Sequence, residues 1–345
     1  MGRKSAPAGG WREAWRRARV GAEMMKLSLK KVRRAGSIIA LTIVCVVIVA
    51  ITLTVGWRPI IGAKARPLTN RRFEPTLARF ERGKYLVESV AGCFECHSSG
   101  AGKGGGKVFG EGAVAPNITP DAETGAGVWT DDQLARAIRE GIGHDGRAMT
   151  PLMPYWAYRK MSDEDLASIV TYLRALEPVR NQLPPAKLPV PLKLLSKILP
   201  EPVTAPVAAP DATSPAKRGE YFVELAHCVA CHTPRTALGL NEKLKFAGGA
   251  DVEGVTSANI TPDPSGISYY DEALFVKTMR TGHVGARPLK PIMPWKVYGN
   301  MSDEDLKAVF TYLRTLKPVK HLVDNTEPPT DCKLCGYKHG LGERN

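Results

Sequence analysis

Apolar residues recur at helical spacing through most of the chain, and one uninterrupted apolar run lies near its start. Between Ala35 and Trp57 there is no charged residue, and most of the positions in residues 37–56 are apolar. About twenty residues at 1.5 Å rise span the ~30 Å hydrocarbon core of a bilayer. Basic residues crowd the N-terminal side of the run, at Lys26, Lys30, Lys31, Arg33 and Arg34. The pattern predicts a transmembrane helix over 37–57 after a basic cytoplasmic tail over 1–36, with the rest of the chain on the outer side of the membrane.

Two alternatives bear on this N-terminal segment. The apolar run could belong to a cleaved signal peptide, with Ala63-Lys64-Ala65 as the cleavage site. That run is longer than the usual signal-peptide core, and the cleavage site lies well beyond it, so a retained anchor is favoured. Met24 and Met25 open a stretch that already has the form of a basic leader, which makes them an alternative start.

Amphipathic periodicity predicts helices in the rest of the chain. Ser162–Leu176 and Ser302–Leu316 each place apolar residues on one stripe behind a serine N-cap. Thr130 begins a capping box for a helix through about Gly141. Further helices are expected over Thr76–Ala91 and from Ala216 onward. Sustained apolar/polar alternation with hairpin turns is missing from the sequence, so the predicted fold class is all-α.

The sequence after the membrane segment runs through the same series of motifs twice. Arg82–Glu88 returns as Arg218–Glu224, and the six residues Met161–Leu166 recur unchanged at Met301–Leu306. The period of about 140 residues is far longer than a solenoid repeat. The chain is therefore expected to contain two tandem domains of one fold.

These repeats set the predicted domain boundaries. Residues 73–180 and 214–321 form the two domains, and residues 181–213 form the linker between them. Ten prolines fall in Pro178–Pro215, a density that favours extended backbone and a semi-rigid strap. A C-terminal tail follows over 322–345.

Composition excludes some classes of protein. Hydrophobic residues make up 43% and charged residues 24%, which is ordinary for a globular chain. The formal net charge is +14, but residues 1–34 hold eleven Lys and Arg against two Glu. Most of the basicity is therefore a tail, and a nucleic-acid-binding surface spread over the whole chain is excluded. Aromatic residues are only 7%, few for two cores built from side chains alone.

The two repeats carry the same cysteine motif. Cys93, Cys96 and His97 recur as Cys228, Cys231 and His232. A Cys-x-x-Cys pair followed at once by histidine is the attachment signature of c-type haem. The two thiols bond one edge of the porphyrin, and the histidine faces the iron. A disulfide or a thioredoxin-like pair would explain neither the histidine nor the repeat, so the sequence predicts two covalently bound haem c groups.

Methionines are the expected ligands on the far side of each iron. Met153 and Met293 recur in Met-Pro segments, 56 and 61 residues after the two histidines. Irregular backbone next to proline can direct a thioether inward, so these two are the predicted distal ligands. Other methionines are disfavoured because they lack a counterpart or begin a helix where packing explains them: Met149, Met279, Met161 and Met301. Histidine on both sides of the iron, with His144 and His283, stays open.

Shared motifs carry a resemblance to a known family. Each repeat resembles a class I cytochrome c domain. The segments Asn117–Asp121 and Gly127–Thr130, the Met-Pro-Tyr segment at Met153 and the helix after Ser162 resemble the membrane-associated cytochrome subunits of periplasmic alcohol and gluconate dehydrogenases. The strap from Leu183 to Leu192 is also similar to their connector. The resemblance covers about 73–321. Those subunits typically carry three haems and have their anchor elsewhere, whereas this chain has two attachment motifs and an N-terminal apolar run.

A third cysteine pair lies near the C-terminus. Cys332 and Cys335 are followed by His339, three positions too late for a haem attachment motif. A disulfide in an oxidising compartment is the favoured interpretation. A small metal site, with His321 as a fourth ligand, and a redox pair that docks a partner are the alternatives.

The predicted function is electron transfer. An iron with six filled positions binds no substrate, and methionine ligation raises its reduction potential. The chain would then relay single electrons in the periplasm, anchored to a bacterial inner membrane. Its redox partner would be a dehydrogenase, a quinol-oxidising complex or a terminal oxidase. A dihaem peroxidase is the alternative from the enzyme class, and a haem-based sensor or assembly factor is a weaker one.

Overall fold

The structure is a computed structural model that describes residues 10–54, 57, 62–211, 213–236 and 239–345. The chain divides into two compact units, Met1–Ile61 and Gly62–Asn345. Each unit is described by itself below.

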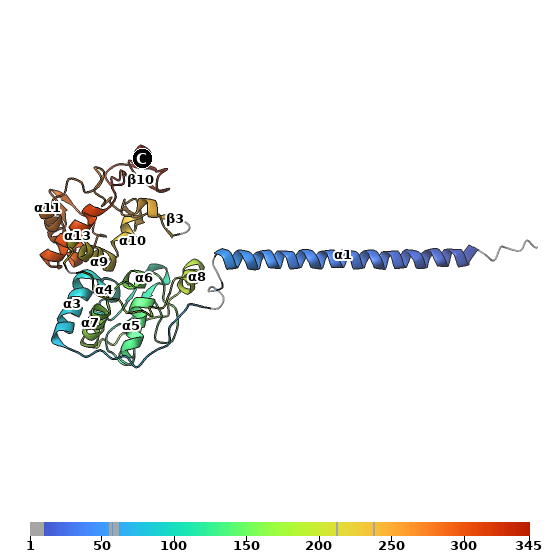
Figure 1. Ribbon diagram of the computed structural model, residues 1–345, viewed down its shortest axis with the longest axis horizontal. Helices are drawn as coiled ribbons and strands as arrows, with labels where there is room; N and C mark the ends of the chain where they lie inside the picture. Colours follow the sequence, from blue (N-terminus) through green and yellow to red (C-terminus); the bar gives the residue numbers. More distant parts are fainter. Residues whose placement is uncertain (1–9, 55–56, 58–61, 212, 237–238) are drawn as a thin grey trace, which may run out of the picture. The chain divides into compact units, whose positions relative to one another are not determined.

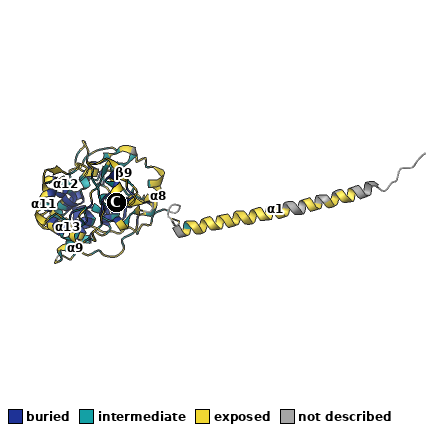
Figure 2. Cartoon of the chain, turned by 90° about the horizontal axis from the view of Figure 1, so that it is seen from above, coloured by how far each residue is buried: buried dark blue, intermediate teal, exposed yellow. Residues whose placement is uncertain are grey.

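The first unit contains one long helix, α1 (Gly10–Thr54) (Figure 1). It begins well before the apolar run, because the basic residues that precede the run are mostly good helix formers. The segment expected as a tail over 1–36 is therefore helical from Gly10 onward, and the structure describes α1 as far as Thr54. The segment Glu23–Thr52 is long and apolar enough to cross a membrane by length and composition, a test that a signal sequence also passes. Figure 2 shows its described residues mostly exposed.

The second unit contains the two repeats, and their helices follow one order. In repeat one these are α3 (Leu77–Tyr85), its π-helical continuation η1 (Leu86–Val90), α4 (Cys93–His97), the short 3-10 turn η2 (Gly110–Gly112), α5 (Asp131–Glu140), α6 (Tyr155–Tyr158) and α7 (Asp163–Arg174). In repeat two they are α9 (Pro215–Leu225), α10 (Cys228–His232), the 3-10 turn η3 (Glu242–Leu244), α11 (Glu272–Thr281), α12 (Trp295–Tyr298) and α13 (Asp303–Thr315). The predicted helices are present, and the chain is mostly helical.

Five antiparallel ribbons of two or three residues per strand accompany the helices in the part of the chain that the structure describes. They pair β1 (Lys107–Val108) with β2 (Val114–Ala115), β3 (Arg235–Thr236) with β4 (Gly239–Leu240), β5 (Asp251–Val252) with β6 (Val255–Thr256), β7 (His283–Val284) with β8 (Arg287–Pro288), and β9 (Pro329–Asp331) with β10 (Lys338–Gly340). The C-terminus ends in a 3-10 turn, η4 (Gly342–Arg344). Sequence analysis missed these ribbons because two or three residues are too few to show alternation.

The predicted helix caps are present. The Thr130 side chain accepts a hydrogen bond from the Gln133 N–H, and the Gln133 side chain accepts one from the Thr130 N–H, which completes the capping box of α5. Ser162 and Ser302 cap α7 and α13 through their side-chain oxygens. The apolar stripes of α7 and α13 are buried in the core, with Leu166 and Leu306 each 1% exposed.

The first and last helices of each repeat cross at a glycine. A Cβ atom on Gly83 of α3 would lie 2.0 Å from the Ser168 backbone oxygen of α7. A Cβ atom on Gly219 of α9 would lie 1.9 Å from the Ala308 backbone oxygen of α13. The glycine of the repeated Arg-Gly motif therefore lets the backbones of the two helices touch.

The linker between the repeats is partly helical. The expected strap over 181–213 contains α8 (Val190–Ile198), which starts behind Pro189 and carries Pro191 in its first turn. Proline is tolerated there because the first N–H groups of a helix have no partner within it. Both flanks of α8 bond to repeat one: Lys187 N–H donates to the Gly112 oxygen at 2.8 Å, and Asp163 N–H donates to the Val207 oxygen at 2.9 Å. The strap is thus fastened along repeat one.

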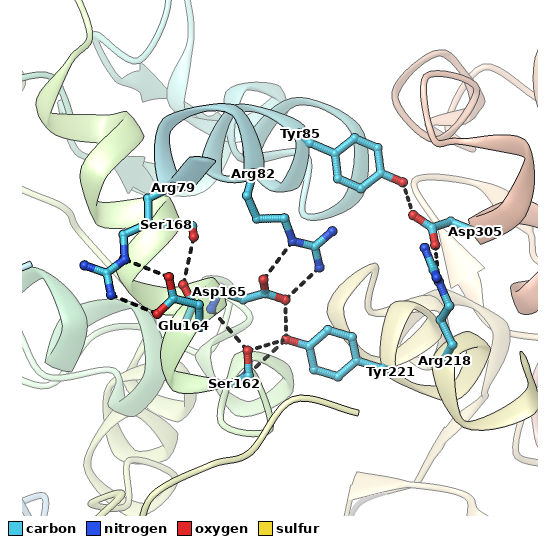
Figure 3. A network of polar contacts seen from close by, with 10 residues as sticks. All are labelled: Arg79, Arg82, Tyr85, Ser162, Glu164, Asp165, Ser168, Arg218, Tyr221 and Asp305. Atoms are coloured by element: carbon cyan, nitrogen blue, oxygen red, sulfur yellow. Dashed lines mark hydrogen bonds and ion pairs between the residues drawn. The ribbon is translucent and has the colours of Figure 1, made fainter. Parts of the chain in front are cut away.

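A reciprocal set of polar contacts joins the two repeats (Figure 3). Within repeat one, Arg82 holds both carboxylate oxygens of Asp165 at 2.8 Å. Tyr221 of repeat two donates its hydroxyl to the same carboxylate at 2.7 Å and accepts the Ser162 N–H at 3.0 Å. The carboxylate is therefore shared between an arginine of its own repeat and a tyrosine of the other.

The same contact exists in the opposite direction. Arg218 holds Asp305 at 2.6 Å within repeat two, and Tyr85 of repeat one donates its hydroxyl to Asp305 (Figure 3). Burial and the neighbouring Asp305 carboxylate raise the pKa of Tyr85 to about 12, so its hydroxyl remains a donor at neutral pH. Each tyrosine comes from the repeated Arg-Gly-x-Tyr motif. Each repeat therefore donates one tyrosine hydroxyl to a carboxylate of the other repeat.

We predict that Gly83→Ala destabilises the second unit. The added methyl group would meet backbone of α7, and overpacking of this kind costs about 1–3 kcal/mol. Urea unfolding measures the effect. Gly100→Ala is the matched control, because a Cβ atom there meets nothing within 4 Å. Equal stability of the two variants would contradict the close crossing.

We predict that the double variant Tyr85→Phe, Tyr221→Phe weakens the coupling between the repeats. Each substitution removes a hydrogen bond to a charged group, worth about 1.5–3 kcal/mol. Thermal unfolding should change from one shared transition to two. Tyr269→Phe, at an exposed tyrosine, should leave the single transition unchanged. A double variant that still unfolds in one transition at the wild-type temperature would show that these tyrosines do not couple the repeats.

Candidate haem attachment sites

The first Cys-x-x-Cys-His motif forms the short helix α4. Gly92 caps its start in a left-handed conformation, with φ of 59°. The buried Tyr158 donates its hydroxyl to the Ala91 oxygen at 3.3 Å, which ties α6 to the residue just before this turn. Cys93 and Cys96 both lie on the turn as free thiols. They are one helical turn apart, as attachment to one edge of a porphyrin requires.

The orientation of His97 suits a metal ligand. Its ring Nδ1 lies 2.7 Å from the Pro116 carbonyl oxygen, which accepts the Nδ1 proton. The other ring nitrogen, Nε2, then carries the lone pair that can bind iron. Burial lowers the pKa of His97, which favours the neutral imidazole that a metal needs.

The second motif repeats this arrangement in α10. His227 takes the place of Gly92, with φ of 44°. His232 is half-buried, and its Nδ1 lies 2.7 Å from the Ala258 carbonyl oxygen. Tyr298 donates its hydroxyl to the Ala226 oxygen at 2.9 Å, as Tyr158 does in repeat one. Both histidines therefore offer Nε2 to a metal for the same reason.

The repeated Asn-Ile-Thr-Pro-Asp motif positions the two carbonyl groups. Asn117 Oδ1 accepts the Thr119 N–H and hydroxyl, at 3.0 and 2.7 Å, which closes a tight turn next to Pro116. The Asn117 amide also donates to the Val179 oxygen at 2.6 Å, beyond the last helix of the repeat. Asn259 makes the same contacts in repeat two, to Thr261 and Val319.

The four recurring methionines differ in burial. Met161 and Met301 are 0% and 3% exposed in the core, so packing accounts for them. Met153 and Met293 are half-buried and pack against the core. Each precedes a proline whose backbone lies outside the regular helical and extended regions, Pro154 with ψ of 43° and Pro294 with ψ of 50°.

The two alternative distal histidines lie in exposed positions. His144 stacks on Trp129 with ring centroids 4.3 Å apart. The Nδ1 atom of His283 lies 2.9 Å from the Thr281 oxygen at the start of β7. These local contacts account for the two histidines without an iron, and Met153 and Met293 stay the predicted distal ligands.

Each attachment turn lies next to a helix of the other repeat. Tyr158 of repeat one lies edge-on to His227, which precedes Cys228, with ring centroids 6.5 Å apart. In the other direction, a Cβ atom on Gly92 would lie 3.4 Å from Val297 of repeat two. The interface therefore brings the two sites together.

A disulfide between the two C-terminal cysteines stays a prediction. Cys332 and Cys335 are both buried. His321 and His339 lie beside them, so the structure brings together all four residues that the sequence analysis named for this region. The reason is that two imidazoles from separate segments pack against the cysteine turn.

Sequence reasoning missed several residues that shape these sites. The carbonyl groups of Pro116 and Ala258 carry no side-chain signal, although both stand just before the repeated Asn-Ile-Thr-Pro-Asp motif. Tyr158 and Tyr298 recur at the same point of each repeat, a signal that could have identified them. The contacts across the interface could not be read from either repeat alone.

The donor set fits the predicted cofactor. Each repeat offers two thiols on one turn and an imidazole whose Nε2 is free for a metal, while Nδ1 is bonded to a carbonyl group. These are the groups that covalent haem c requires, a thioether at each cysteine and a proximal histidine.

Comparisons with known proteins agree with this geometry. Residues 78–173 match the family described as cytochrome c oxidase, cbb3-type, subunit III, and residues 216–317 match the cytochrome c family. The chain is 34% identical over 280 residues to the fructose dehydrogenase cytochrome subunit of Gluconobacter japonicus, covering 72% of this chain and 56% of the relative. It is 31% identical over 268 residues to the gluconate 2-dehydrogenase cytochrome c subunit of Pantoea cypripedii, covering 69% and 60%. The chain thus spans little more than half the length of these two relatives.

A third relative is matched over most of its length. The chain is 30% identical over 253 residues to a dihaem c-type cytochrome of Cereibacter sphaeroides, covering 67% of this chain and 84% of the relative. Two cytochrome c domains, each with an attachment motif, account for two covalently bound haem c groups. The chain belongs to the family of dihaem c-type cytochromes.

Proposed function

We propose that this cytochrome is the electron-transfer subunit of a membrane dehydrogenase. The observation that carries the proposal is the apposition of the two attachment turns, which lets an electron pass from one repeat to the other. Haem c supplies one-electron chemistry at its iron, and the fold supplies burial, ligands and orientation. A dehydrogenase removes two electrons from an alcohol or a sugar, so two adjacent one-electron carriers suit such a partner.

Individual residues have distinct roles in this proposal. Cys93, Cys96, Cys228 and Cys231 hold the two haem groups covalently. His97 and His232 bind iron through Nε2, each oriented by its bond to a carbonyl oxygen. Met153 and Met293 bind on the opposite side. Filled coordination on both sides excludes substrate from the iron, which favours electron transfer over the peroxidase alternative.

The placement of the chain follows from α1. We propose that the apolar half of α1 is retained as a single anchor in a bacterial inner membrane, with the basic residues on the cytoplasmic side. Both haem domains then lie in the periplasm, where c-type cytochromes and their dehydrogenase partners meet. The length and composition of Glu23–Thr52 support this placement.

The domain division has structural support. We propose two class I cytochrome c domains over 73–180 and 214–321, joined by the strap over 181–213. The helix pairs α3 with α7 and α9 with α13 each cross closely within one repeat. Their buried side chains belong to one core that runs through both repeats. Arg66 lies upstream of the first boundary and still bonds to repeat one, at 2.7 Å from both Asp132 and Glu140. The chain just before residue 73 is therefore fastened to the first domain.

The partner is tested by substrate-driven reduction. Detergent-solubilised membranes that contain the tagged chain are captured, washed and made anaerobic, and fructose, gluconate or an alcohol is then added. We expect one of these substrates to reduce both haem groups, seen in the absorption spectrum, because the captured dehydrogenase passes its electrons to the chain.

A variant that lacks both attachment sites, Cys93→Ser with Cys228→Ser, is the control and should show no haem reduction. Haem groups that dithionite reduces but none of these substrates reduces would contradict a dehydrogenase partner of this class. Consumption of peroxide by the captured protein would favour the peroxidase alternative.

The distal ligands are tested one at a time. Met153→Ala and Met293→Ala should each convert one haem to high spin and lower its reduction potential by on the order of 0.1 V, because axial ligands tune haem potentials over a range of about 0.8 V. Electron paramagnetic resonance and a redox titration measure these changes. Met149→Ala, in the same loop as Met153, is the matched control and should leave both haem groups low-spin. An unchanged spectrum in either ligand variant would show that the assigned methionine does not bind iron.

A further inference from the structure

A second set of metal-binding side chains lies apart from the haem sites. His321, Cys332, Cys335 and His339 are all buried, and one ligand atom from each lies within 4.8 Å of the others. His321 follows α13, the two cysteines lie in the turn between β9 and β10, and His339 lies on β10. Three separate parts of the chain therefore meet at one point.

Both imidazoles are oriented as metal ligands. His321 Nδ1 lies 2.9 Å from the Ala247 oxygen, and His339 Nδ1 lies 3.0 Å from the Gly340 oxygen. Each Nδ1 proton is thereby bonded to a carbonyl group, which leaves Nε2 with a lone pair. His321 Nε2 lies 3.5 Å from Cys332 Sγ. His339 Nε2 is buried and has no hydrogen-bond partner among the described residues. A buried acceptor of this kind is costly unless something binds it.

Backbone hydrogen bonds close the turn that carries the two cysteines. Cys332 N–H donates to the Tyr337 oxygen at 2.9 Å, and Gly336 N–H donates to the Cys332 oxygen at 2.9 Å, so the turn folds back on itself. This turn holds the two sulfur atoms on the same side as the two imidazoles.

The size of the site fits one tetrahedral ion. Bonds of about 2.3 Å to sulfur and 2.0–2.1 Å to nitrogen place the ligand atoms of a tetrahedral zinc site roughly 3.3–3.8 Å apart. The 3.5 Å between Cys332 Sγ and His321 Nε2 falls within that range, and the 4.8 Å limit on the whole set leaves room for small adjustments. A two-iron cluster ligated by two cysteines on one iron and two histidines on the other would need the pairs farther apart.

We propose that His321, Cys332, Cys335 and His339 bind one structural zinc ion. Two thiolates and two neutral imidazoles form a closed donor set with the ligands that zinc prefers. Bound zinc would also protect the thiols from oxidation to a disulfide.

The ion would fasten the C-terminal segment to the second haem site. His321 packs on Gly249, where a Cβ atom would lie 2.3 Å from the imidazole Cε1. The neighbouring Gly248 donates its N–H to the His232 oxygen at 2.9 Å. The zinc site therefore supports the loop that follows the second attachment turn.

Metal analysis of the purified full-length chain tests the proposal. The chain carries a tag without histidines, is matured with both haem groups and is treated with a chelator to remove loosely bound ions. Inductively coupled plasma mass spectrometry should then find one zinc for every two irons. Mass spectrometry of the non-reduced chain should find both C-terminal cysteines reduced. A zinc-free chain with a Cys332–Cys335 disulfide would overturn the proposal, as would a different metal in stoichiometric amount.

Variants locate the ion. Cys332→Ser and His339→Asn should each abolish the zinc and leave two irons per chain. Cys45→Ser and His283→Asn, at exposed positions, are the matched controls and should retain it. Zinc that persists in both site variants would refute these ligands. If a site variant does not fold, titration of the Cys45→Ser chain with a mercurial decides instead, because its only remaining thiols are Cys332 and Cys335 once both haem groups are attached. Release of one zinc for two thiols is expected.

Discussion

One interaction orients all four histidines that this account assigns to metals: the hydrogen bond between imidazole Nδ1 and a backbone carbonyl oxygen. The distance from Nδ1 to the carbonyl oxygen is 2.7 Å for His97 and His232, 2.9 Å for His321 and 3.0 Å for His339. Because a neutral imidazole has one proton, the bond fixes that proton on Nδ1 and leaves Nε2 to the metal. The turns and loops that supply these carbonyl groups are therefore as much a part of each site as the histidine itself.

The second constraint is the pairing of the repeats. Asp165 and Asp305 each accept an arginine from their own repeat and a tyrosine from the other. These carboxylates are largely buried, so their partners are needed to offset the cost of removing a charge from water. The same interface places each attachment turn next to a helix of the other repeat. The interface between the two repeats therefore serves both the stability of the pair and the proposed electron transfer.

Many structural features of the chain could be predicted from its sequence. The features that could not be predicted were missed for physical reasons. Helices with a cap and a five-residue apolar stripe, such as the one after Ser162, are local and could be predicted. The Cys-x-x-Cys-His motif is also local, and the repeat made it specific. The strand ribbons were too short to show a period, and α8 lay inside a proline-rich strap. Contacts such as Tyr221 with Asp165, or His321 with Cys332, join distant segments and depend on the tertiary fold.

Anomalous X-ray diffraction from crystals of the mature protein would identify the ligand atoms of each metal. Data collected at the iron and zinc absorption edges locate each metal independently. We expect iron bound to Nε2 of His97 and of His232, and zinc bound to Nε2 of His321 and His339. A metal bound through Nδ1 at any of these histidines, with the carbonyl bond broken, would contradict the role of the Nδ1 hydrogen bond.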